Sequence, residues 1–227
     1  MNTIHTISKY LTYIKDNTFD DSMIRSKETH AEIKSFIEQN FNNPDSNEVQ
    51  IKEGTRTIAG SAFFLTGIAK IIIPDSVTRI GPSAFKNCSK LTDVKLPGKL
   101  ETIPEYLFFH SESLKEIDIP DSVKGIGNYA FAKCTGLEKA HLNEGLETIS
   151  EYSFNGCSSL TDIEIPSTVQ TIEAYAFSEC SGLKSVTIPD GVKALSSGVF
   201  KKCTGLTEVT VPESVTYIAD FGESDAF

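Results

Sequence analysis

A phenylalanine recurs every 23 residues along most of the chain, and this period constrains the fold more than any other feature. The series consists of Phe85, Phe108, Phe131, Phe154, Phe177 and Phe200. An earlier copy starts at Ala62-Phe63 and is one residue shorter. Such periods are the signature of repeat architectures, in which each unit buries its apolar face only against its neighbours. The chain is therefore predicted to form a solenoid.

Each unit contains two short apolar patterns. The first is Leu-x-x-Ile-x-Ile-Pro, as in Leu114, Ile117 and Ile119 before Pro120. This alternation predicts a short strand with one buried face, and the proline, which has no amide donor, ends the backbone pairing. The second pattern, Val/Leu-x-x-Ile, predicts an extended or turning return path. Units stacked at the strand spacing of about 4.8 Å would bury a narrow core in which the phenylalanines lie on one another.

The repeats resemble the BspA-type leucine-rich repeat. The pattern Ile-Gly-x-x-Ala-Phe-x-x-Cys-x-x-Leu-x-x-Val-x-Leu-Pro runs from Ile80 to Pro97, and related copies cover residues 49–227. The resemblance implies a repeat solenoid of the leucine-rich repeat class, a β-rich right-handed superhelix of about seven repeats. It also implies a non-enzymatic protein-binding scaffold with an adhesive role toward host matrix or cell-surface proteins. Fold alone does not fix function, so this step is an analogy.

Residues 1–47 do not repeat, and we expect them to form an α-helical N-terminal cap on a solenoid of residues 48–227. Ile4, Ile7 and Leu11 lie at helical spacing, and Thr29-x-x-Glu32 is typical of a capping box that opens a second helix. A cap covers the open end of a repeat array. At the other end the last strand has no such cover, so end-to-end self-association of an otherwise monomeric chain is an alternative.

The outward positions of the predicted strands are the candidate partner-binding residues, because the concave strand face of a solenoid is its usual binding surface. They form two columns on either side of the buried central residue of each strand. The first column is Lys70, Asp93, Glu116, Lys139, Asp162, Ser185 and Glu208. The second column is Ile72, Lys95, Asp118, His141, Glu164, Thr187 and Thr210.

The middle of these columns is acidic around a cationic centre. Carboxylates at 116, 118, 162 and 164 bracket Lys139 and His141. This charge could steer a basic partner or hold Ca²⁺ loosely through its carboxylates, and a solvated face that needs charge for solubility is the alternative. No aromatic residue stands in either column, which lowers the case for sugar stacking.

The five cysteines occupy one column, three residues after the repeat phenylalanine: Cys88, Cys134, Cys157, Cys180 and Cys203. No closely spaced pair suits zinc, and side chains that point the same way suit disulfides poorly. We therefore expect buried space-filling thiols, with no metal and no cofactor. The four histidines share no ligand spacing and no nucleophile–base–orienter set is visible, so the sequence predicts no catalytic residues and no enzyme.

The net charge of −10 excludes the basic footprint that nucleic acids require. No apolar run approaches the length of a membrane span, so insertion into a membrane is not expected. The family resemblance implies a secreted or cell-surface protein. The start of the chain lacks the basic and apolar regions of a secretory signal, so an intracellular adaptor or effector with a cytosolic partner is the alternative.

Overall fold

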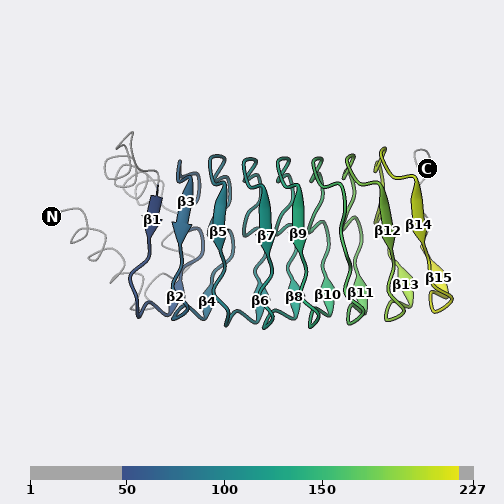
Figure 1. Cartoon of the computed structure of the whole chain (residues 1–227), viewed down its shortest axis with the longest axis horizontal. Helices are drawn as coiled ribbons and strands as arrows, with labels where there is room; N and C mark the ends of the chain where they lie inside the picture. The colour runs from purple at the N-terminus through teal and green to yellow at the C-terminus, as the bar shows by residue number, and fades with distance from the viewer. Residues whose placement is uncertain (1–47, 220–227) are drawn as a thin grey trace.

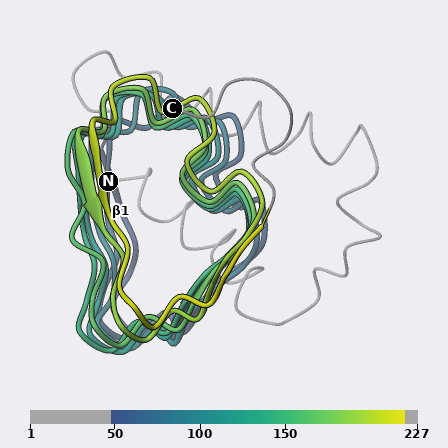
Figure 2. The ribbon, with the colours of Figure 1, turned by 90° about the vertical axis from the view of Figure 1, so that its right-hand side faces the viewer.

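A computed structural model describes residues 48–219. The helical cap predicted for residues 1–47 and the C-terminal edge after residue 219 lie outside the described part, so both stay predictions. The described residues form a β-solenoid of about seven turns, whose coils stack side by side along the long axis (Figure 1). Seen along that axis, the coils superpose on one closed outline (Figure 2). The predicted repeat solenoid is therefore confirmed.

Two series of short strands run along the solenoid (Figure 1). The first has three-residue strands with exposed outer residues: β1 (Glu48–Gln50), β3 (Lys70–Ile72), β5 (Asp93–Lys95), β7 (Glu116–Asp118), β9 (Lys139–His141), β12 (Ser185–Thr187) and β14 (Glu208–Thr210). The second has two-residue strands: β2 (Thr57–Ile58), β4 (Arg79–Ile80), β6 (Thr102–Ile103), β8 (Gly125–Ile126), β10 (Thr148–Ile149), β11 (Thr171–Ile172), β13 (Ala194–Leu195) and β15 (Tyr217–Ile218). The Leu-x-x-Ile-x-Ile pattern thus forms the first series, and the return path holds the second.

Paired strands are parallel, and each residue lies opposite the equivalent residue of the next coil. In β7 and β9, for example, Asp118 pairs with His141. Pairing is interrupted in both series, because β5 is not paired with β7 and β4 is not paired with β6. For β4 and β6 the sequence supplies a reason. Gly81 and Gly127 donate backbone N–H groups to the preceding coil, whereas the equivalent Pro104 has no N–H to donate.

A third ladder of backbone hydrogen bonds runs along the corner that carries the phenylalanines. The N–H groups of Tyr129 and Phe131 donate to the carbonyl oxygens of Glu151 and Ser153 over 3.0 and 2.8 Å. Residues two positions before and after the phenylalanine have positive φ, as at Tyr129 (56°) and Lys133 (61°). Residues other than glycine rarely adopt this backbone conformation. It persists here because every coil repeats the same set of bonds to the next one.

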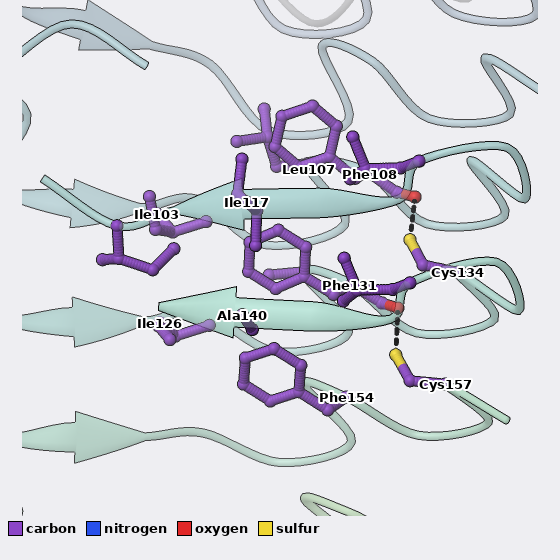
Figure 3. Close-up of a cluster of buried hydrophobic side chains, with 14 of the residues drawn as sticks. Ile103, Leu107, Phe108, Ile117, Ile126, Phe131, Cys134, Ala140, Phe154 and Cys157 are labelled. Carbon is purple, nitrogen blue, oxygen red and sulfur yellow. Dashed lines mark hydrogen bonds between the residues drawn. The ribbon is translucent and has the colours of Figure 1, made fainter. Parts of the chain in front are cut away.

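The core is one continuous column of side chains along the solenoid axis. Neighbouring phenylalanine rings stack with centroids 5.1–5.8 Å apart and planes inclined by 7–15°: Phe63, Phe85, Phe108, Phe131, Phe154, Phe177 and Phe200. Figure 3 shows three of these rings beside the central residues of the strands. The stacking predicted from the 23-residue period is confirmed, with a spacing slightly wider than that of paired strands.

The glycines that precede the strand leucines are needed for close packing of coils. A Cβ atom at Gly182 would lie 2.5 Å from the carbonyl oxygen of Ser158, and one at Gly136 would lie 2.3 Å from that of Glu112. Any side chain at these positions would force neighbouring coils apart, although the backbone conformation itself is one that other residues adopt. Each glycine therefore fixes the distance to the coil before it.

Candidate functional site

The two predicted columns lie on the surface of the solenoid, and we call their fourteen residues the strand face. Each member is exposed, and each flanks a buried or half-buried residue such as Ile117 or Val209. The parallel register aligns equivalent positions of successive coils, so the columns run along the solenoid axis. The alternation of the strand pattern is sufficient to place these side chains outward.

One coil departs from the expected secondary structure. The chain from 162 to 164 has no regular strand, although the sequence predicts one there, and β9 and β12 are therefore not joined through it. The burial pattern is nevertheless kept, because Ile163 is buried between exposed Asp162 and Glu164. The strand face thus continues across this coil, because the packing of Ile163 keeps the outer side chains exposed although the backbone forms no regular pairing.

A hydrogen bond and an ion pair cross from coil to coil on the strand face. The Nε2 atom of His141 lies 2.8 Å from Oε1 of Glu116, and the Nζ atom of Lys70 lies 3.8 Å from Oδ2 of Asp93. All four side chains are largely exposed, and such pairs contribute little to stability. Their effect is to orient charged groups along the surface.

Glu116, Asp118 and His141 are the residues of the described part whose geometry could hold a metal ion. One ligand atom from each lies within 4.8 Å of the others, and all three side chains are exposed. An imidazole nitrogen with two carboxylates is a donor set that suits first-row divalent ions better than Ca²⁺, which prefers oxygen ligands throughout. Of the acidic patch predicted from the sequence, Glu116 and Asp118 lie close to His141, whereas Asp162 and Glu164 are not part of this group.

A half-exposed column of tyrosines runs along another face and is not among the site residues predicted from the sequence. Tyr106, Tyr129, Tyr152 and Tyr175 stack with ring centroids 4.7–4.9 Å apart. The available signal was their spacing of 23 residues, two positions before each phenylalanine. Desolvation, followed by the neighbouring tyrosines and Glu151, raises the pKa of Tyr152. These tyrosines lie outside the strands, so the alternation of the strand pattern does not include them.

Both ends of this tyrosine column are covered. The Nζ atom of Lys86 lies 5.0 Å from the ring centroid of Tyr106, in cation–π contact. At the other end Tyr175 lies over Gly198, where a Cβ atom would approach the ring to 2.3 Å. Within the described residues, therefore, the stack presents ring edges and hydroxyl groups to solvent, and its ring faces are occupied. A sugar that needs an open ring face has no place on it.

The five cysteines are free and buried, and each thiol has a defined partner. Cys134 and Cys157 donate S–H groups to the carbonyl oxygens of Phe108 and Phe131, at 3.0 and 3.2 Å (Figure 3). Ser111, which replaces cysteine in one coil, donates in the same way to the carbonyl of Phe85 over 2.9 Å. The thiols therefore do more than fill space, since each adds a second hydrogen bond to a corner carbonyl that already accepts a backbone N–H.

Burial makes these thiols poor nucleophiles. Desolvation raises the pKa of Cys134 to about 12 and that of Cys88 to about 11, against an ordinary value of 9.0. A thiol must ionise to attack a substrate or bind a metal. The cysteine column is thus a structural element of the core.

A lysine–glutamate pair spans two coils and gives the solenoid a pH-dependent contact. The Nζ atom of Lys133 donates to Oε2 of Glu179 over 2.5 Å and passes over Gly156 to reach it. This hydrogen bond lowers the pKa of the Glu179 carboxyl below its ordinary 4.5. A depressed folded-state pKa contributes stability above the unfolded pKa, and the contribution is lost as the pH falls through the folded pKa.

We expect Glu179→Gln to lower the melting temperature near neutral pH, and we expect this effect to disappear as the pH falls from the ordinary 4.5 through the lowered pKa of Glu179. Melting curves of both chains between about pH 7 and pH 3 would measure it. Glu208→Gln is the matched control, because Glu208 is exposed and forms no ion pair within the described residues. A deficit of the Glu179 variant that stayed constant over this pH range would contradict the expectation.

No helix of the described part is both long and apolar enough to cross a bilayer. A comparison with curated proteins gives no match. A comparison with protein families matches the BspA type Leucine rich repeat region over residues 12–138 and 101–222. This match covers most of the chain and includes every described coil.

Solved structures of bacterial leucine-rich repeat proteins resemble the solenoid. The Leucine Rich Repeat protein of T. pallidum is 27% identical, with a TM-score of 0.57 over 76% of this chain and 73% of that one. A leucine rich cell surface protein of Faecalibacterium prausnitzii is 24% identical, with a TM-score of 0.52 over 72% of this chain and 59% of that one. The Pneumococcal vaccine antigen PcpA is 20% identical, with a TM-score of 0.50 over 76% of this chain and 62% of that one.

Leucine-rich repeat proteins of this kind are typically non-enzymatic scaffolds for protein–protein interaction. The described coils stack through parallel strands, and a corner of phenylalanine and cysteine recurs along them. The family match to the BspA type repeat covers all of these coils. The chain therefore belongs to the BspA-type leucine-rich repeat family.

Proposed function

We propose that the chain recognises a protein partner through the strand face, and that it acts in adhesion to a matrix or cell-surface protein. The observation that carries this proposal is the ordered array of fourteen exposed side chains along the coils. Coil-to-coil hydrogen bonds hold the backbone of most of these positions, so little conformational entropy is lost when a partner binds. The adhesive role rests on the resemblance of the repeats to the family.

The charge of the strand face favours recognition by electrostatic complementarity. Its central carboxylates are all exposed and lie on two coils, Glu116 and Asp118 on one and Asp162 and Glu164 on the other, with the coil of Lys139 and His141 between them. Exposed charges of one sign steer an oppositely charged partner and set the association rate more than the final affinity. The expected partner surface is accordingly basic, and binding is expected to weaken as salt rises.

The test is affinity capture with a charge-reversed variant in which Glu116, Asp118, Asp162 and Glu164 are changed to lysine. Immobilised chains would be incubated with matrix and membrane proteins and, separately, with a cytosolic extract. We expect a matrix or membrane protein to bind the parent chain and to be lost from the variant, while circular dichroism shows both to be folded.

Two outcomes would contradict the proposal. A partner retained by the variant would locate binding on another face, such as the tyrosine column. A partner that came only from the cytosolic extract would replace adhesion with an intracellular adaptor role on the same scaffold.

A further inference from the structure

A groove of about 830 Å³ opens on the strand face at the interruption between β5 and β7. Its volume is in the range of sites that hold a substantial ligand. The lining comes from the two strands and the turns that follow strands β3, β5 and β7: Asp75, Thr92, Asp93, Val94, Lys95, Leu96, Gly98, Lys115, Glu116, Asp118, Ile119, Pro120 and Asp121. In Figure 1, β7 stands visibly further from β5 than from β9.

Among the described residues, the backbone of the groove has N–H and carbonyl groups without a partner at positions where β7 and β9 bond to each other. Between β7 and β9, Ile119 N–H donates to the carbonyl of His141 over 2.9 Å. The equivalent bond between β5 and β7 would join Leu96 N–H to the carbonyl of Asp118, and it is not formed. Backbone amides and carbonyls are strong hydrogen-bonding groups. The groups that β5 and β7 leave unpaired are therefore available to polar groups of an occupant.

The side chains of the groove select the charge of that occupant. Five carboxylates line it, against the two ammonium groups of Lys95 and Lys115. Lys115 is already paired with Glu138, at 3.0 Å, which lies outside the lining. Asp118 and Asp121 form no ion pair within the described residues. These two carboxylates are free to accept charge-assisted hydrogen bonds from lysine or arginine.

The coil beside the interruption also differs in its core. Leu107 stands where the flanking coils carry Ala84 and Ala130, and all three side chains are buried. This coil therefore packs more side-chain volume between its neighbours than the coils on either side. The groove thus lies beside the one coil of the described part in which the corner alanine is replaced by leucine.

From these observations we propose that the groove between β5 and β7 binds an extended, basic segment of the protein partner. Lysine or arginine side chains of the segment contact Asp118 and Asp121, and its polar side chains reach the backbone groups that β5 and β7 leave unpaired. The inference rests on the proposed function, and it specifies the groove as the binding site and basic side chains as the groups that are recognised. A nucleic acid would be repelled by the carboxylates, and a small apolar ligand would leave them without partners.

The test uses the whole chain and a fluorescent eight-residue peptide of alternating arginine and threonine, which is cationic and prone to extended structure. Anisotropy would be measured at low salt, both with and without EDTA. The groove variant is Asp118→Asn with Asp121→Asn. The matched control is Asp190→Asn with Glu213→Gln, which removes the same charge from exposed turn residues outside both the groove and the strand face. A peptide with glutamate in place of arginine tests the sign of the charge.

We expect the groove variant to bind the arginine peptide at least about tenfold more weakly, which corresponds to the loss of one or two charge-assisted hydrogen bonds. The control variant should change affinity by less than about twofold, and the glutamate peptide should not bind. Equal losses in both variants, binding of the glutamate peptide, or binding that EDTA abolishes would each overturn the proposal. The last result would mean that peptide binding depends on a metal ion held by Glu116, Asp118 and His141.

The same variants separate this inference from the proposed function. A captured partner that is lost from the charge-reversed variant and retained by the groove variant would refute the groove and keep recognition through the strand face. A partner retained by both variants would refute both.

Discussion

Replacement of Phe154 with alanine is expected to lower the free energy of unfolding by about 3–5 kcal/mol. The ring is fully buried and stacks on Phe131 and Phe177 with centroids 5.1 and 5.3 Å apart. Its removal would leave a cavity that the two neighbouring coils can fill only by losing their own backbone bonds. Unfolding in urea, followed by circular dichroism, would measure the change.

The matched control is Phe200→Ala. Within the described residues this ring stacks on one neighbour only, Phe177, and is 9% exposed. The same substitution should therefore cost clearly less there than at Phe154. Equal losses at the two positions would show that stacking along the column does not determine the cost.

A second large effect is expected from Cys157→Ala, which should destabilise the chain by about 1–3 kcal/mol. The substitution removes a buried sulfur atom and the S–H donor to the carbonyl of Phe131. That carbonyl keeps one partner, the N–H of Cys134. The loss therefore combines a small cavity with one of two hydrogen bonds.

Cys157→Ser separates the two contributions, because a hydroxyl keeps the donor. Ser111 shows that the corner accommodates serine in this role. We expect the serine variant to be more stable than the alanine variant, and unfolding of both under reducing conditions would compare them. An alanine variant as stable as the serine variant would mean that the hydrogen bond has no net effect.

The sequence predicted those features that repeat with the same residue types. The phenylalanine stack, the buried cysteine column and the exposed strand positions all follow from side chains that recur every 23 residues, because equivalent positions of successive coils must lie side by side. The tyrosine column has the same signal and could have been predicted from it. The helical cap and the role of the strand face stay predictions.

The features that could not be predicted arise between coils. The interruption between β5 and β7 depends on how two coils settle against each other, and the apolar pattern of both strands is intact. The irregular chain around Ile163 is similar, since its sequence matches that of the regular strands. The hydrogen bonds of the cysteines depend on the direction of each S–H group. A pattern of residue types specifies the column in which a side chain stands, but the distance to the next coil is set by packing.

The stacked tyrosines have a practical consequence for spectroscopy. The chain has no tryptophan and seven tyrosines, of which Tyr106, Tyr129, Tyr152 and Tyr175 belong to one stack. Near-ultraviolet circular dichroism detects aromatic rings held in fixed asymmetric surroundings. Without a tryptophan signal on top of it, this column serves as an intrinsic optical reporter of whether neighbouring coils are in contact. Loss of order between any two of these coils can be followed without a label.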